Sequence, residues 1–349
     1  MKKPPPLSPN QHQRIEGFCA HRPLLGPETV HIDITNTCNL DCITCWNYAP
    51  GLASPKNAAW KKQRMASAIF SRVLSEVAEC GVERIILSGA GEPFTHPGIY
   101  DFIAAVKAKG LVLTVITNGT LCDFQRLKEL GVDQLLINTS SASAATYTTY
   151  HPNQPPETFE NLIEGVISLA GAVAVNLVQV INALNADELT AMVELAHQAH
   201  ARASFKLGDT PPGTECCRLD IDRRKTLLEH DIPAAIARAK ALGVKHNLAA
   251  FAAQLAGSHP LHAPLPCFAG YLYSRVYVDG RVFFCCEHIE VGNVEKADFG
   301  TLWLAPAYNA IRQSLHEGLV FPGCARCGKH DMNFVANKQL AMLMNEVAE

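Results

Sequence analysis

Short apolar runs rich in β-branched residues alternate with longer amphipathic segments between residue 30 and about residue 207. The runs are found at residues 30–35, 84–88, 113–117, 134–138, 175–181 and 203–207. Most of the intervening segments have apolar residues at helical spacing, and the clearest end in a glycine, which suits a helix C-terminus. Strands that alternate with helices pair in parallel, so the pattern predicts an α/β fold, either a (βα)6 partial barrel or an open sheet.

The pattern changes after residue 210. Residues 219–243 have helical periodicity, and the stretch at 243–251 is compatible with one more strand. Apolar and polar residues then alternate on both sides of Asp279 and Gly280, an Asp-Gly pair that predicts a β-hairpin. We therefore divide the chain into an N-terminal extension, a barrel, a bridging helical segment, a small hairpin domain surrounded by cysteines and a C-terminal helix, at residues 1–29, 30–210, 211–265, 266–335 and 336–349.

The composition limits the class of protein. Hydrophobic residues make up 48% of the chain and charged residues 18%, which is typical of a globular protein. The formal net charge is −3 and no long basic run is present, so we expect no nucleic-acid partner. The N-terminus lacks the apolar core of a signal peptide, and no long apolar stretch predicts a membrane span. We expect a cytoplasmic protein, in which thirteen cysteines favour metal or redox chemistry over disulfides.

Three of these cysteines, Cys38, Cys42 and Cys45, lie in a loop that follows the first predicted strand. Loops at the carboxyl ends of parallel strands are where α/β folds collect their chemistry. Three thiolates can bind three irons of a [4Fe–4S] cluster and leave the fourth iron open to a small molecule. A zinc knuckle is the alternative, although structural zinc usually takes four ligands in pairs.

The spacing Cys-x3-Cys-x2-Cys after a first strand resembles the signature of the radical SAM superfamily. The resemblance implies a (βα)6 partial barrel in which S-adenosylmethionine (SAM) chelates the open iron. It also implies that SAM is cleaved reductively to a 5′-deoxyadenosyl radical, which abstracts a hydrogen atom from the substrate. One departure is Thr44, because the family has an aromatic residue at that position and here Trp46 follows the third cysteine.

Further polar residues at the strand ends resemble SAM-binding positions of the family. The segment `SGAGEP` resembles its glycine-rich motif, which implies that Gly89 and Gly91 allow close approach of the backbone and that Glu92 accepts from the SAM ammonium. Other candidate contacts to SAM follow the third, fourth and fifth strands, at Asn118, Ser140 and Asn182, and the substrate contacts we consider are Lys206 and Asp209. The asparagines and the serine could instead be turn or cap residues. Lys206 and Asp209 could instead form a solvated pair.

A second group of cysteines surrounds the predicted hairpin. By ligand count, four of them suit zinc or a four-thiolate [4Fe–4S] cluster equally well: Cys267, Cys285, Cys324 and Cys327. The segment `DGRVFFC` and the later Cys-x2-Cys resemble the SPASM and shorter twitch extensions of the radical SAM superfamily. The resemblance implies one auxiliary [4Fe–4S] cluster, with Cys285 favoured over the adjacent Cys286, since neighbouring strand residues face opposite sides.

The overall layout is similar to that of 2-deoxy-scyllo-inosamine dehydrogenase, a twitch-bearing radical SAM enzyme. The similarity implies an oxidoreductase that takes hydrogen from a small sugar-, cyclitol- or nucleoside-like substrate, with the auxiliary cluster as electron acceptor and flavodoxin or ferredoxin as external reductant. Modification of a ribosomal peptide is the first alternative, although only about 30 residues precede the first strand and no peptide-recognition domain is evident there. A zinc or iron–sulfur binding protein without SAM chemistry is the second.

Overall fold

The structure is a computed structural model that describes residues 7–257, 267–285, 289–319, 321, 324 and 330–348. Nine strands form one sheet in the order β6-β5-β4-β3-β2-β1-β7-β8-β9. The strands are β1 (Thr29–Asp33), β2 (Arg84–Ser88), β3 (Val112–Thr117), β4 (Gln134–Asn138), β5 (Ala174–Ile181), β6 (Arg202–Leu207), β7 (Tyr273–Val276), β8 (Arg281–Phe283) and β9 (Glu290–Asn293). The first six pair in parallel and begin and end within two residues of the predicted runs, so the (βα)6 prediction is confirmed.

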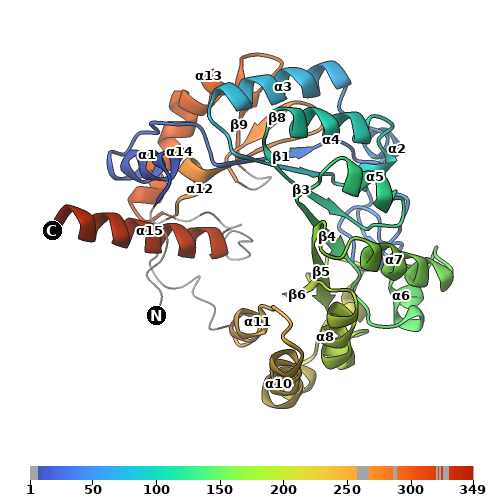
Figure 1. The fold of residues 1–349 in the computed structure, drawn as a ribbon. Coiled ribbons are helices and arrows are strands. Elements are labelled where there is room, and N and C mark those ends of the chain that lie inside the picture. The colour runs from blue at the N-terminus through green and yellow to red at the C-terminus, as the bar shows by residue number, and fades with distance from the viewer. Residues whose placement is uncertain are drawn as a thin grey trace.

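Helices cover the outer face of the curved sheet (Figure 1). The helices of the barrel are α2 (Ala58–Lys61), α3 (Ser67–Glu79), α4 (Ile99–Ala108), α5 (Phe124–Glu129), α6 (Ala144–Tyr150), α7 (Glu157–Ser168) and α8 (Leu189–Gln198). Those outside it are α1 (Pro9–Cys19), α9 (Ile221–Thr226), α10 (Ile232–Leu242), α11 (Leu248–Leu255), α12 (Ala269–Leu272), α13 (Phe299–Leu304), α14 (Pro306–His316) and α15 (His330–Ala348). Among the described residues no helix is long and apolar enough to cross a bilayer.

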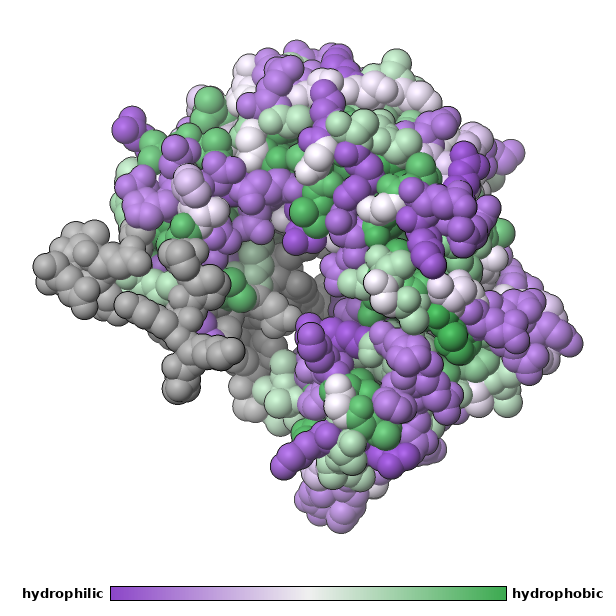
Figure 2. Space-filling view, viewed as in Figure 1, coloured by the Kyte–Doolittle hydropathy of each residue, from purple (hydrophilic) through white to green (hydrophobic). Residues whose placement is uncertain are grey.

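The two faces of the sheet differ in chemistry. Alternate residues of the strands, such as Ile85, Leu113 and Leu135, are fully buried in the main hydrophobic cluster. On the opposite face, polar residues bond across three adjacent strands, where Arg84 donates to Thr114 and Thr114 donates to Gln134. Hydrophilic residues also border the hollow in the middle of the described surface (Figure 2). The inner face of the barrel thus combines these polar side chains with apolar ones such as Ile86 and Leu136, whereas the outer face forms the packed core.

The predicted hairpin is confirmed, and its first strand joins the barrel sheet. Strand β7 pairs in parallel with β1 over Thr29–Ile32, so the hairpin extends the barrel sheet. A buried ion pair adds to this junction, since Arg275 Nε lies 2.7 Å from Asp33 Oδ2. Burial alone would raise the pKa of Asp33, but the charge of Arg275 and a contact from His31 hold that pKa well below its usual range. The hairpin and the barrel thus share one continuous sheet.

Three further expectations differ from the structure. The stretch 243–251 gives only an isolated bridge between Ala203 and His246, because the Asn247 side chain bonds both the N–H and the C=O of Phe205 and takes the place of a strand at that edge. Helix α1 lies in the N-terminal extension, where no element was predicted. The C-terminal helix begins at residue 330, six residues before its predicted start.

Candidate functional site

The three-cysteine loop joins β1 to the segment that leads to α2. Cys38, Cys42 and Cys45 are all partly buried. The backbone N–H of Leu40 donates to Cys38 Sγ and that of Asn47 to Cys45 Sγ, each at 3.4 Å. Such N–H···S bonds stabilise charge on sulfur and are one of the means by which proteins tune iron–sulfur clusters.

The electrostatics of the loop favour a bound cation. Burial, and then the neighbouring acidic groups, raise the pKa of Cys38 to about 12 despite the bond from Leu40. Burial and the two other cysteines also raise the pKa of Cys42 well above its usual value. Three thiolates would therefore repel one another here unless a metal centre supplied positive charge.

The geometry favours a cluster over a single ion. In the described part of the chain, no three His, Cys, Asp or Glu side chains converge closely enough to hold one metal ion. A [4Fe–4S] cluster has no such requirement, because each of its irons takes a different thiolate. The loop therefore fits a cluster that takes three thiolates better than it fits zinc.

The two glycines of the `GAGEP` turn allow it to pack against the start of the cysteine loop. A Cβ on Gly89 would lie 2.3 Å from the carbonyl oxygen of Thr35, and one on Gly91 would lie 2.1 Å from that of Thr37. The Glu92 N–H donates to the same Thr37 oxygen at 2.8 Å. In this structure the glycines thus allow the backbone of the turn to approach the backbone of the cysteine loop closely, and the turn supports that loop.

Glu92 connects this turn to the end of β3. It is 2% exposed, and burial raises its pKa to about 7. Its carboxylate accepts from the Thr117 hydroxyl and the Asn118 N–H, both at 2.6 Å, and from the Phe94 N–H at 3.1 Å. A contact between Glu92 and the ammonium of SAM stays a prediction, and it would add to these three bonds.

Asn118 extends the same network to the cysteine loop. Its Nδ2 donates to Asn39 Oδ1 at 2.9 Å, and its Oδ1 accepts from the N–H and the hydroxyl of Thr120. Asn39 follows Cys38 and donates in turn to Thr120 Oγ1 at 2.8 Å. The structure thus gives Asn118 a positioning role beside Cys38, and a direct contact to SAM stays a prediction.

Helix α6 contributes residues that the sequence did not indicate. The Thr44 and Tyr150 hydroxyls are hydrogen-bonded, and the Ile43 N–H donates to the Tyr150 carbonyl at 3.1 Å. Tyr147 and Tyr150 are both almost fully buried, and burial followed by the nearby Cys42 raises their pKa values. Although Thr44 replaces the aromatic residue usual in the family, Tyr150 therefore places an aromatic side chain against it.

The structure places Ser140 and Asn182 at the ends of β4 and β5, but both are engaged within the protein. Ser140 is fully buried at a positive φ of 48°, and its hydroxyl donates to Asn138 and accepts from the Val180 N–H. Asn182 Oδ1 accepts from the Leu184 N–H at 2.9 Å. Their contacts to SAM stay predictions, and their observed bonds are those of turn residues.

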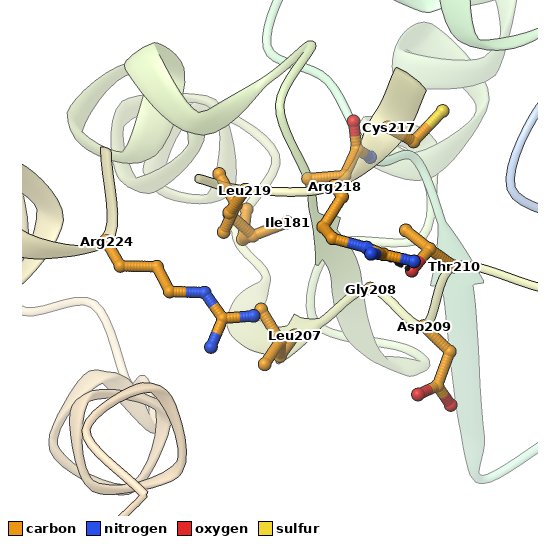
Figure 3. A pocket seen from close by; sticks show the side chains of 10 residues that line it. Ile181, Leu207, Gly208, Asp209, Thr210, Cys217, Arg218, Leu219 and Arg224 are labelled. Carbon is orange, nitrogen blue, oxygen red and sulfur yellow. Dashed lines mark hydrogen bonds between the residues drawn. The ribbon is translucent and has the colours of Figure 1, made fainter. Parts of the chain in front are cut away.

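A pocket of about 160 Å³ lies at the ends of β5 and β6, and Asn182 and Asp209 are among its lining residues. Arg218 and Arg224 extend into it from the segment after β6, and the Asp209 carboxylate points away from them (Figure 3). Arg218 Nε lies 3.4 Å from Thr210 Oγ1. The exposed Lys206 is not among the residues that line the pocket.

The second cysteine group is described in part. Cys267 and Cys285 pack against the same hydrophobic cluster, and the Asn333 side chain from α15 donates to Cys267 Sγ at 3.8 Å. Cys324 is also partly buried, and it forms no disulfide with the other described cysteines. Cys286 and Cys327 lie outside the described residues, so this structure does not test their roles.

Comparison with known families agrees with these two sites. Residues 32–196 match the Radical SAM superfamily, and residues 267–328 match SPASM, an iron–sulfur cluster-binding domain. The chain carries a radical SAM domain followed by a SPASM domain. Radical SAM and SPASM domains imply [4Fe–4S] clusters and SAM as cofactors, and the three-cysteine loop is the site whose donors fit the SAM-binding cluster.

Several curated proteins resemble parts of this radical SAM protein. The AdoMet-dependent heme synthase of Methanosarcina barkeri is 26% identical over 54% of the chain and 52% of its own length. A PqqA peptide cyclase of Methylobacterium sp. is 31% identical over 51% and 46%, so the chain spans about half the length of these relatives. A longer alignment to the PqqA peptide cyclase of Methylocella silvestris is 24% identical over 89% of the chain and 82% of that protein.

Solved structures share the fold at low sequence identity. Streptococcus suis SuiB bound to the precursor peptide SuiA has a TM-score of 0.64 at 15% identity, covering 86% of this chain and 70% of SuiB. The enzyme anSMEcpe with bound AdoMet has a TM-score of 0.63 at 14% identity, covering 87% of each chain. These structural similarities establish the fold, and they do not identify the substrate of this chain.

Proposed function

We propose that this radical SAM protein modifies a ribosomally made peptide. The observation that supports this most is the alignment with a PqqA peptide cyclase over 324 residues, a span too long to fit within either domain alone. The alignments with heme synthase and with a GTP 3′,8-cyclase extend over 192 and 180 residues. The comparisons therefore favour a peptide over the small sugar-like substrate that the layout of the cysteines suggested.

The carboxyl end of the barrel offers charged partners to such a substrate. The pocket at the ends of β5 and β6 is lined by Arg218 and Arg224, whose guanidinium groups suit a carboxylate of the ligand. Because the six strands are parallel, this pocket and the cysteine loop after β1 lie at the same end of the barrel. We place the substrate between the cysteine loop and the pocket.

The side chains around the cysteine loop have separate roles in this proposal. Bound SAM and its cluster supply a carbon-centred radical that removes a hydrogen atom from the substrate. Cys38, Cys42 and Cys45 hold the cluster, while Asn39 and Asn118 fix the orientation of the loop through their mutual hydrogen bond. The buried residues behind the loop exclude water from it, as a reactive carbon radical requires.

We further propose that the auxiliary site accepts the second electron, so that the modification is a net oxidation. Cys267, Cys285, Cys324 and Cys327 would hold this cluster with all four thiolates, which leaves no iron open for substrate. In support, Cys267 and Cys285 lie on either side of the hairpin strands β7 and β8, and β7 pairs with β1, the strand that leads into the cysteine loop. The reaction would release a modified peptide and 5′-deoxyadenosine.

The test is co-expression of the chain with short peptides encoded near its gene, followed by mass spectrometry of each peptide. We expect one peptide to lose two hydrogen atoms with formation of 5′-deoxyadenosine, and no change with Cys42→Ala. Formation of 5′-deoxyadenosine that depends on a nucleotide, sugar or porphyrin, and on none of the peptides, would overturn the proposal.

A further inference from the structure

A basic segment follows the third cysteine. Residues 46–64 contain Lys56, Lys61, Lys62 and Arg64 and no aspartate or glutamate, although acidic residues outnumber basic ones in the whole chain. In the described part of the chain, none of these four cations takes part in a salt bridge. Lys56 lies over the Trp60 ring and Lys61 over the Tyr48 ring, and no carboxylate of the described residues pairs with any of the four.

This segment is attached directly to the cysteine loop. The Thr37 hydroxyl donates to the Lys61 carbonyl at 3.0 Å, and the Asn36 N–H donates to the Gln63 carbonyl at 2.9 Å. From the other side, the Tyr48 hydroxyl donates to the Asn36 carbonyl at 2.6 Å. Because these bonds join it to the residues just before Cys38, the basic segment has a fixed position beside the cluster site.

The same segment exposes an aromatic residue among its cations. Trp46, the residue after Cys45, is 50% exposed, and Lys56, Lys62 and Arg64 are exposed as well. We call these four residues together with Lys61 the α2 surface. Helix α2 lies on the side of the barrel away from α1 and α15 (Figure 1), so this surface is distinct from the region of the auxiliary cysteines. Exposed Trp and Arg side chains are enriched in protein-binding surfaces.

The chemistry of the site indicates the kind of partner. Each reductive cleavage of SAM would consume one electron, which an external donor would first transfer to the cluster, with oxidation of the donor. We propose that the α2 surface is the docking site of an acidic one-electron carrier protein of the flavodoxin type. Opposite charges steer such carriers into small, short-lived complexes, which a patch of this size can form. This inference rests on the radical SAM function proposed above.

The test compares two electron sources for cleavage of SAM to 5′-deoxyadenosine by the cluster-loaded protein. Lys56→Glu with Lys62→Glu should lower the rate with reduced flavodoxin by about tenfold at low salt, because electrostatic steering is reversed. The same variant should keep the wild-type rate with dithionite, a small reductant that needs no docking site. The matched control is Lys240→Glu with Lys245→Glu, which changes the net charge equally at exposed positions elsewhere and should leave both rates unchanged.

Equal losses with both reductants, no loss with flavodoxin, or the same loss in the control variant would overturn the docking site. If wild-type protein forms no 5′-deoxyadenosine with dithionite, the proposed function fails instead. Binding of flavodoxin is then measured directly by titration. In that titration the double variant should bind about tenfold more weakly than the control, and equal affinity would overturn the inference.

Discussion

Replacing Arg275 with alanine should destabilise the junction between the hairpin and the barrel. The substitution leaves the Asp33 carboxylate buried without its 2.7 Å partner, and its other oxygen lies 3.5 Å from His31 Nε2. Removing one member of a buried ion pair costs about 3–5 kcal/mol. Since Arg275 is 22% exposed, we expect the lower value of about 3 kcal/mol, or a fall of about 4 °C in Tm for a chain of this length.

The matched control is Arg281→Ala in the same hairpin. Arg281 pairs with Asp279 and Glu290, but its side chain is 40% exposed, so its loss should cost less than about 1 kcal/mol. Adding Asp33→Asn to Arg275→Ala should recover part of the stability, because the unpaired charge is then removed. The Tm values of the wild type and the three variants are measured on cluster-loaded protein by thermal unfolding, followed anaerobically by circular dichroism.

The pH dependence gives a second readout of the same pair. The folded-state pKa of Asp33 lies below its unfolded value, so its contribution to stability is present above about pH 4 and is lost as the pH falls further. The difference in stability between wild type and Arg275→Ala should therefore be large at pH 7 and shrink toward pH 3. A difference that does not change with pH, or a Tm shift no larger than that of Arg281→Ala, would refute the reasoning.

Three further substitutions test the two cluster sites. Gly91→Ala should lower the iron content of the protein, because its Cβ would clash with Thr37, whereas Gly98→Ala in the same region meets only ordinary contacts and should keep its iron. Glu92→Gln should weaken SAM binding in a titration and also lower the free energy of unfolding by about 1–3 kcal/mol, since it loses an acceptor for a buried N–H; unchanged SAM affinity would contradict the predicted contact. Cys324→Ala with Cys327→Ala should keep much of the 5′-deoxyadenosine formation but lose most of the modified peptide, and a folded variant that couples both products as before would show that the auxiliary site is not the acceptor.

The sequence indicated the barrel strands because each carries a periodic apolar signal of its own. The same period predicted the hairpin but not its pairing with β1, since parallel pairing joins residues that lie more than 240 positions apart. Strand β9 was not predicted either, because its four residues include Gly292 and Asn293, which are uncommon in strands. Local patterns thus reveal elements more readily than the way they assemble.

The same limit applies to the site. The three cysteines form a local motif, so their spacing was sufficient to predict a cluster loop. Tyr150 contacts that loop from 106 positions away and has no motif of its own, so only the structure brings it to Thr44. For the glycines of the `GAGEP` turn the structure adds a second role, because they make room for the carbonyls of Thr35 and Thr37, and their close approach to SAM stays a prediction.

The most direct test of the radical SAM site is to measure iron content and SAM cleavage together in the wild type and in the variant Cys38→Ala/Cys42→Ala/Cys45→Ala. With one SAM-binding and one auxiliary [4Fe–4S] cluster, the wild type should contain roughly eight irons per chain and the variant roughly four. The variant should form no 5′-deoxyadenosine with dithionite, while its remaining cluster stays intact. Undiminished 5′-deoxyadenosine formation in the variant, or zinc in place of iron in the wild type, would contradict a SAM-binding cluster held by this loop.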